Sequence, residues 1–119
     1  MFVDDEIWLL EIARVFLTRA GYGVRGFTNP LEALEDFCDR ANHYDIVLTD
    51  LIMPKLSGLA FASEIAHRRP DIPIILSTGF GCDWSEDEKH RLGIRETIQK
   101  PYTAETLVSV INNALGRHR

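Results

Sequence analysis

Two short runs of apolar and β-branched residues, 45–49 and 72–77, constrain the fold more than any other feature of the sequence. Such continuous runs, without polar alternation, are typical of strands covered on both faces. Longer amphipathic segments alternate with these runs and with three shorter ones, so a strand is followed by a helix five times. Strands that alternate with helices through short connections form a parallel sheet with helices on both faces. We therefore expect a three-layer α/β domain.

The expected elements follow from hydrophobic spacing and from the positions of glycine, proline and capping residues. We expect strands at 2–3, 24–27, 45–49, 72–77 and 96–99. We expect helices at 6–20, from 29–30 onward, at 57–68, at 85–91 and from 103 to 116. Asn29 and Thr103 are the expected N-caps of the second and the last helix.

Helical spacing also marks an apolar side of the first two helices. In the first helix, the residues that recur at helical spacing are Leu9, Ile12, Ala13, Phe16 and Ala20. We expect the second helix to bury Leu31, Leu34, Phe37 and Cys38.

The length of 119 residues corresponds to one compact domain, and we expect residues 1–119 to form it with no effector domain in this chain. The net charge of -5 argues against nonspecific binding to nucleic acid, which requires a basic surface. No apolar run approaches the roughly 20 residues that span a bilayer, and the acidic N-terminus is not a secretory signal. Two cysteines, Cys38 and Cys82, are too few for a disulfide framework and indicate reduced thiols. We therefore expect a cytoplasmic protein with no membrane contact.

Acidic, hydroxyl and lysine side chains follow the predicted strands at the edge where such sheets bind ligands. Asp4 and Asp5 follow the first strand and Asp50 the third, while Thr78 and Lys100 follow the fourth and fifth. Carboxylates that lie close together repel one another unless a cation intervenes, and Mg²⁺ prefers such oxygen ligands. A lysine and a threonine opposite them can bind phosphate, and a carboxylate can act as a nucleophile. The pattern indicates Mg²⁺-assisted phosphoryl transfer onto an aspartate.

Four short motifs, in this order, resemble the receiver domain of two-component response regulators. They are Asp4-Asp5-Glu6, residues 50–54 followed by Gly58, Ser77-Thr78-Gly79, and Lys100-Pro101. The resemblance covers essentially the whole chain. It implies a flavodoxin-like (βα)5 fold with a five-stranded parallel sheet in the order 2-1-3-4-5.

The resemblance also implies a phosphorelay function. Asp50 would accept a phosphoryl group from a phosphohistidine on a histidine kinase or a histidine phosphotransfer protein. Thr78 and Lys100 would contact that phosphoryl group. The domain would catalyse only its own phosphorylation and dephosphorylation, and would signal by binding a protein partner according to its phosphorylation state.

A Mg²⁺ site is implied by the same match. Asp5, Asp50 and the backbone carbonyl of Ile52 would bind the ion, and Asp4 would act through water. In the family, the positions of Ile52 and Phe80 flank the path of the water that attacks the aspartyl phosphate. Two bulky apolar side chains there hinder water, so we expect slow self-dephosphorylation.

Receivers often carry an aromatic switch residue three positions before the lysine, where this chain has Thr97. Coupled movement of a threonine and an aromatic residue is therefore not expected, although movement of Thr78 remains open. The downstream partner is expected to bind the last strand and the last helices. Trp84 and Tyr102 lie in that region, where they either contact the partner or pack on the domain; a homodimer is a further alternative.

Several related or rival functions are compatible with parts of the sequence. The segment 94–102 is similar to receivers fused to hybrid sensor histidine kinases, and a pseudo-receiver would bind partners without phosphorylation. A haloacid-dehalogenase-type phosphatase needs a second acid where this chain has Ile52. An FMN-binding flavodoxin-like domain needs a hydroxyl-rich loop after the first strand, where this chain has acids. The acid, threonine and lysine set favours a phosphorylated receiver over the pseudo-receiver, the phosphatase and the FMN-binding domain, and the C-terminal receiver of a hybrid sensor histidine kinase stays an alternative.

Overall fold

The computed structural model describes residues 1–79 and 85–116. Five strands form one parallel sheet in the order β2-β1-β3-β4-β5, which confirms the expected flavodoxin-like topology. The strands are β1 (Phe2–Val3), β2 (Gly26–Phe27), β3 (Val47–Asp50), β4 (Ile74–Thr78) and β5 (Glu96–Gln99). The helices are α1 (Ile7–Arg19), α2 (Pro30–Arg40), α3 (Gly58–Arg68), α4 (Glu86–Arg91) and α5 (Ala104–Ala114).

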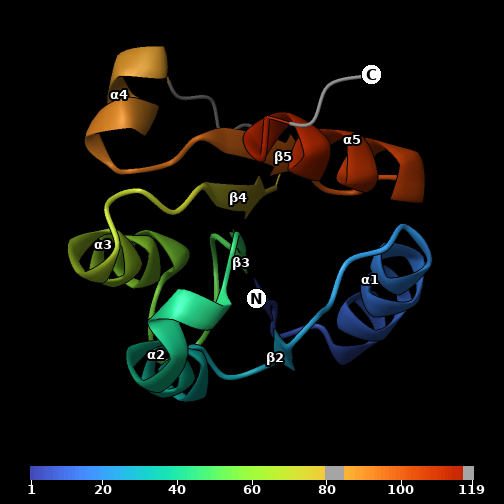
Figure 1. The fold of residues 1–119 in the computed structure, drawn as a ribbon, viewed down its shortest axis with the longest axis horizontal. Coiled ribbons are helices and arrows are strands. Elements are labelled where there is room, and N and C mark those ends of the chain that lie inside the picture. Colours follow the sequence, from blue (N-terminus) through green and yellow to red (C-terminus); the bar gives the residue numbers. More distant parts are fainter. Residues whose placement is uncertain (80–84, 117–119) are drawn as a thin grey trace.

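Helices cover both faces of the sheet, as Figure 1 shows: α1 and α5 lie on one face and α2 and α3 on the other. Each face has its own hydrophobic cluster. Phe37, Phe61 and Ile74 belong to the cluster under α2 and α3. Ile75 and Ile98 belong to the cluster under α1 and α5. Side chains alternate along each strand, so the two clusters together hold the sheet in the middle of the domain.

Side chains cap the helices where the sequence predicts it. The Asn29 side chain accepts a hydrogen bond from the Leu31 amide, and the Thr103 side chain accepts one from the Thr106 amide. These caps satisfy amides that have no partner inside the helix. They fix where α2 and α5 begin, and α5 begins only a few residues beyond the end of β5.

Three strands are shorter than expected. β2 contains only Gly26–Phe27, β3 begins at Val47 rather than 45, and β4 begins at Ile74 rather than 72. Pro73 has no amide hydrogen, so it contributes only its carbonyl, which accepts from the Val47 amide at 3.1 Å. A short 3-10 helix, Ala41–His43, follows α2 and was not expected.

Of the α1 residues that recur at helical spacing in the sequence analysis, only Ala13 is buried. The helix buries Leu10, Ala13 and Leu17, whereas Ile12 is 54% exposed and Phe16 is 38% exposed. Apolar residues surround most of this helix, so hydrophobic spacing fits more than one side. The side of α1 that packs against the sheet has a small alanine between two leucines. The remaining apolar residues form a strip at the surface.

The prediction for α2 is wrong in part. Phe37 is buried as expected, but Leu31 is 47% exposed and Cys38 is an exposed free thiol. The buried side of α2 instead contains Pro30 and Ala33. Cys82, Phe80 and Trp84 lie outside the described residues. Among the described residues, no helix has the length and apolar character needed to cross a membrane.

Candidate functional site

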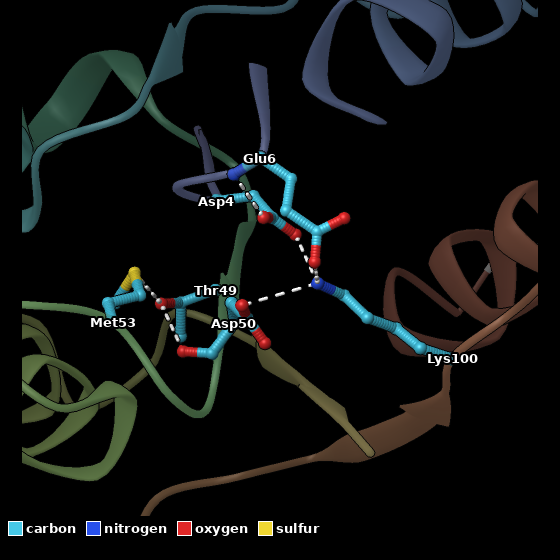
Figure 2. Close-up of polar contacts among 6 residues, drawn as sticks. All are labelled: Asp4, Glu6, Thr49, Asp50, Met53 and Lys100. Atoms are coloured by element: carbon cyan, nitrogen blue, oxygen red, sulfur yellow. Dashed lines mark hydrogen bonds and ion pairs between the residues drawn. The ribbon is translucent and has the colours of Figure 1, made fainter. Parts of the chain in front are cut away.

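Three charged side chains from different strands meet at the carboxyl edge of the sheet. Asp4 directly follows β1, Asp50 ends β3 and Lys100 directly follows β5. β1 pairs with β3 in the register Phe2↔Leu48 and Val3↔Thr49, so the next pair along these strands is Asp4 and Asp50. The topology therefore brings together side chains that lie 46 and 50 residues apart in sequence, as Figure 2 shows.

The Lys100 ammonium lies between three carboxylates. Its Nζ is 2.9 Å from Asp4 Oδ2, 3.2 Å from Asp50 Oδ2 and 3.5 Å from Glu6 Oε1 (Figure 2). Asp4 is fully buried and Asp50 is 8% exposed, while the Glu6 side chain is largely in solvent. Water screens the Glu6 contact, so the two aspartates are the main partners of Lys100.

Backbone hydrogen bonds hold both aspartates in place. Asp4 Oδ1 accepts from the Glu6 amide at 2.9 Å, and the Asp4 amide donates to the Phe27 carbonyl. The Leu51 amide, directly after Asp50, donates to the Ser77 carbonyl at 2.9 Å. The Asp50 carboxylate is thus fixed by the sheet rather than by a loose loop, which suits a group that must react in one orientation.

The electrostatics of the site favour cations. Burial raises the pKa of Asp4 and of Asp50 above the usual value, and Lys100 offsets only part of this effect. Asp4 raises the pKa of Asp50 further, because two carboxylates repel one another. Burial alone would lower the pKa of Lys100, but its contacts with Asp4 and Asp50 outweigh this and raise it. Lys100 is therefore charged, but its single positive charge does not balance the negative charges of both aspartates.

A divalent cation fits this edge of the sheet. Asp4, Asp5 and Asp50 each offer a carboxylate oxygen, and these oxygens lie within 4.8 Å of one another. Asp5 is exposed, so the group opens toward solvent. Mg²⁺ takes oxygen ligands and keeps several waters, which requires such an open carboxylate site.

Gly58 allows α3 to start directly against the end of β3, next to Asp50. Its amide donates to the Leu51 carbonyl at 2.8 Å, and a Cβ at this position would lie 2.1 Å from the Asp50 carbonyl oxygen. No other residue type fits there without moving the backbone of Asp50. The sequence contains Gly58 as part of a motif, but only the fold reveals the close approach.

The remaining predicted site residues have less defined contacts. Thr78 is buried at the end of β4, and its carbonyl accepts from the Lys100 amide at 2.8 Å. Within the described part of the chain, no hydrogen bond links the Thr78 hydroxyl to Asp50 or Lys100. Ile52 lies two residues beyond Asp50, with its side chain 76% exposed. The roles of the Thr78 hydroxyl and of the Ile52 carbonyl stay predictions.

Sequence reasoning gave no role to Glu6 or Thr49. Glu6 supplies the amide that binds Asp4 and a carboxylate near Lys100. The Thr49 hydroxyl donates to the Asp50 carbonyl at 3.1 Å (Figure 2). Glu6 stands in the acidic motif and could have been found there, whereas a buried threonine in a strand gives no such signal.

A parallel 2-1-3-4-5 sheet with two aspartates and a lysine at its carboxyl edge defines a flavodoxin-like domain with a charged site at that edge. The family model of the response regulator receiver domain matches residues 1–112. The chain therefore belongs to the receiver domains of two-component response regulators. Phosphorylation on aspartate and binding of Mg²⁺ at an acidic pocket are general features of this family, whose members are signalling domains.

Similar proteins agree with this assignment. The chain is 34% identical over its whole length to the phosphoglycerate transport system transcriptional regulatory protein PgtA of Salmonella typhimurium, covering 28% of that protein. It is 30% identical to the response regulator SaeR of Staphylococcus aureus, over 98% of this chain and 50% of SaeR. The chain thus spans about a quarter to a half of these relatives.

Solved structures show the same fold. A response regulator receiver domain protein from Clostridium thermocellum has a TM-score of 0.86 at 34% identity, covering 98% of this chain and 92% of that one. The receiver domain of NtrX from Brucella abortus also has a TM-score of 0.86, at 28% identity and 98% coverage of both chains.

Proposed function

We propose that Asp50 accepts a phosphoryl group from a phosphohistidine, on a histidine kinase or a histidine phosphotransfer protein, and that the phosphorylated domain then binds a different partner. The observation that carries this proposal is the contact of Lys100 Nζ with Asp50 Oδ2 at 3.2 Å, at an edge that also holds Asp4 and Asp5. This arrangement gives a carboxylate nucleophile, a cation for phosphate oxygens and a set of metal ligands in one place.

In the transfer, a carboxylate oxygen of Asp50 forms a bond to phosphorus as the bond between phosphorus and the histidine nitrogen breaks. The electron pair of that bond stays on the imidazole, which leaves as the neutral ring once protonated. Lys100 stabilises the negative charge on the phosphoryl oxygens, and the Thr78 hydroxyl donates a hydrogen bond to one of them. Most of the rate comes from position and charge.

Asp4, Asp5, Asp50 and the Ile52 carbonyl are the groups that would hold Mg²⁺. The ion supplies positive charge that reduces the repulsion between the carboxylates and the incoming phosphoryl group. Asp50 must be ionised to attack, and Lys100 together with the cation favours the ionised form at neutral pH. The Glu6 amide donates to the carboxylate of the buried Asp4 and so fixes the position of one carboxylate in the cluster.

The partner that delivers the phosphoryl group must cover the acidic edge, and an apolar surface adjoins that edge. We define the α1 apolar surface as the exposed side chains Trp8, Ile12, Val15 and Phe16. Trp8 is 80% exposed and stands in the first turn of α1, directly after the acidic residues. The spacing of these residues places them along one side of the helix, which suits a helix of the partner lying alongside.

The output of the domain differs from that of receivers with an aromatic switch. Thr97, in β5, has a hydroxyl-bearing side chain in place of an aromatic ring, so the last strand and helices must signal through another residue. A receiver fused to a hybrid sensor histidine kinase would carry the same acid site, and the segment 94–102 favours that setting. A pseudo-receiver would keep the fold but would not take up phosphate.

The test is phosphorylation with a small-molecule phosphodonor and Mg²⁺, followed by intact-mass measurement. We expect one added phosphoryl group in the wild-type domain and none in Asp50→Asn. Thr106→Ala, on the exposed side of α5, serves as the control for a change away from the site. No adduct, with Mg²⁺ binding measured separately, would support a pseudo-receiver.

A further inference from the structure

The α1 apolar surface lies on the side of the helix that faces away from the sheet. Trp8, Ile12 and Val15 are 80%, 54% and 49% exposed. They follow one another at intervals of four and three residues, the spacing of the seam along which two helices pack together. A helix at the surface of a domain normally carries polar residues on this side. An exposed apolar strip bordered by charges is typical of a surface that binds another protein.

Exposed charges of opposite sign lie toward the two ends of this surface. Asp5 and Glu11 lie before and in the first half of α1, whereas Arg14 and Arg19 lie in its second half. Within residues 1–79 and 85–116, these four side chains make no ion pair. The helix dipole favours this order of charges, but it does not explain the apolar strip between them.

The residues of the α1 apolar surface and its charges are arranged symmetrically about Ile12. Trp8 and Phe16 stand four residues before and after it, and Asp5 and Arg19 stand seven residues before and after it. If a second copy of α1 packs antiparallel about a two-fold axis at Ile12, Trp8 meets Phe16 and Asp5 meets Arg19. A carboxylate has two oxygens, so Asp5 can accept from Arg19 of the second copy and still offer an oxygen to a cation.

A second pair of charges obeys the same symmetry. Glu11 and Arg14 lie on the same flank of the α1 apolar surface, because three residues make almost a full turn of helix. About an axis at Ile12, Glu11 of one copy lies close to Arg14 of the other. A parallel pairing would instead bring like charges together, Glu11 against Glu11 and Arg14 against Arg14. The charges therefore select the antiparallel pairing.

A groove beside α1 can receive the tryptophan of the second copy. Phe16 lines this groove together with Ala104 and Val108 of α5. The two helices cover the same face of the sheet, as Figure 1 shows. In the antiparallel pairing, Trp8 of the second copy lies opposite Phe16, at the border of the groove. A large aromatic side chain that enters a pocket on the partner is a common anchor of protein interfaces.

We propose that the α1 apolar surface binds a second copy of this chain, as a two-fold pair of antiparallel α1 helices. The same patch of both copies then forms the interface, as in most homodimers. One pair of helices covers less than the roughly 800 Å² per partner of a standard interface, so we expect a dissociation constant on the order of 10–100 µM. Under the proposed function, this dimer and the complex with the phosphodonor exclude one another. The dimer itself does not require phosphorylation of Asp50.

Sedimentation equilibrium of the chain tests the proposal, at concentrations from roughly tenfold below to tenfold above the expected dissociation constant. The wild type should pass from monomer to dimer across this range. Ile12→Ser, at the two-fold axis, should weaken the dimer at least about tenfold. Its circular dichroism and melting temperature should stay near the wild-type values, because Ile12 is exposed. Glu35→Arg, an exposed change on α2 at the other face of the sheet, should leave the dimer unchanged.

Two charge reversals test the direction of the helices. Glu11→Arg alone and Arg14→Glu alone should each weaken self-association about fivefold, because each places like charges against one another at two symmetric positions. An equimolar mixture of the two variants should recover the wild-type affinity, because one copy then carries two arginines and the other two glutamates. A general loss of helix stability would not be reversed by mixing. Glu35→Arg mixed with Arg14→Glu serves as the control and should show no recovery.

Three outcomes would overturn the inference. A wild type that stays monomeric at the highest concentration would leave the α1 apolar surface to a helix of the phosphodonor. A dimer of the same affinity in Ile12→Ser would place the interface elsewhere on the domain. A mixture of the two charge variants that does not recover would refute the antiparallel pairing. These measurements do not involve Asp50, so the proposed function depends on the mass adduct alone and can fail or hold independently.

Discussion

Replacing Gly58 by alanine is the sharpest test of how the fold places Asp50, the proposed phosphoacceptor. A Cβ at position 58 would lie 2.1 Å from the Asp50 carbonyl oxygen and 2.7 Å from Leu51 Cα. Both neighbours are backbone atoms, so no side chain can rotate away. The carbonyl must retreat by about 0.9 Å merely to reach 3.0 Å, the shortest distance that real Cβ atoms show.

We expect Gly58→Ala to lose about 1–3 kcal/mol of stability, the usual cost of forcing extra atoms into a packed site. The melting temperature should then fall by roughly 5–15 °C. A shift of Asp50 by nearly 1 Å should also slow phosphorylation by a small-molecule donor on the order of 100-fold, because reaction rates depend steeply on alignment. Thermal unfolding and the time course of the mass adduct measure the two effects.

Gly23→Ala provides the control for the loss of a glycine. A Cβ at Gly23 would meet nothing within 4 Å, so this variant should keep its activity and lie within about 1 kcal/mol of wild type. If Gly58→Ala matched Gly23→Ala in both assays, the backbone of Asp50 would have to be more yielding than the packing against α3 indicates. The close approach of α3 would then not be what fixes the position of Asp50.

Three further predictions concern charge, docking and hydrolysis. Because Asp4 and Asp50 have raised pKa values, their ionisation destabilises the metal-free fold. Stability to urea should therefore rise as the pH falls through these raised pKa values toward 3.8, and Mg²⁺ should restore stability at neutral pH. Comparison with Asp50→Asn isolates this contribution, and a contribution of the opposite sign would contradict the charge argument. Trp8→Ser should slow phosphotransfer from a phosphohistidine partner at least tenfold. Phosphorylation by a small-molecule donor and the stability of the domain should stay almost unchanged. A parallel loss of rate in both reactions would rule out a docking role. Ile52→Asn should shorten the lifetime of the aspartyl phosphate severalfold, as followed by mass after the donor is removed, and an unchanged lifetime would show that this exposed side chain does not hinder water.

The arrangement of Asp4, Asp50 and Lys100 could be predicted from the sequence because it depends on topology alone. Once continuous apolar runs identify parallel strands, residues at their carboxyl ends must meet at one edge. Strand positions at 2–3 and 96–99 were predicted correctly because hydrophobic runs and turn residues bound them closely.

The buried side of α1 could not be predicted in the same way. Ile7, Trp8, Ile12 and Val15 are as apolar as Leu10 and Leu17, so spacing alone does not decide which side meets the sheet. The choice depends on how closely the helix can approach, which is a property of the assembled layers. An apolar residue of α1 that stays exposed to solvent is therefore informative, because the sequence of the helix alone does not explain its exposure.

The hydroxyls of Ser77 and Tyr102 were missed for a different reason. A serine in a strand and a tyrosine after a proline are unremarkable in sequence, and their lack of partners exists only in three dimensions. A buried donor without an acceptor is not stabilising in the present state, so the composition of the core does not explain it.

Charge at the site is unbalanced in the free form. Among the described residues, Asp4, Asp5, Glu6 and Asp50 lie at this edge with one ammonium, that of Lys100, so four negative charges meet one positive charge. Phosphorylation would replace the charge on Asp50 with nearly two on the phosphoryl group and make the imbalance larger. A divalent cation held by Asp4, Asp5 and Asp50 would offset part of this charge. The balance between the free and the phosphorylated form should therefore depend on the metal ligands as well as on Lys100.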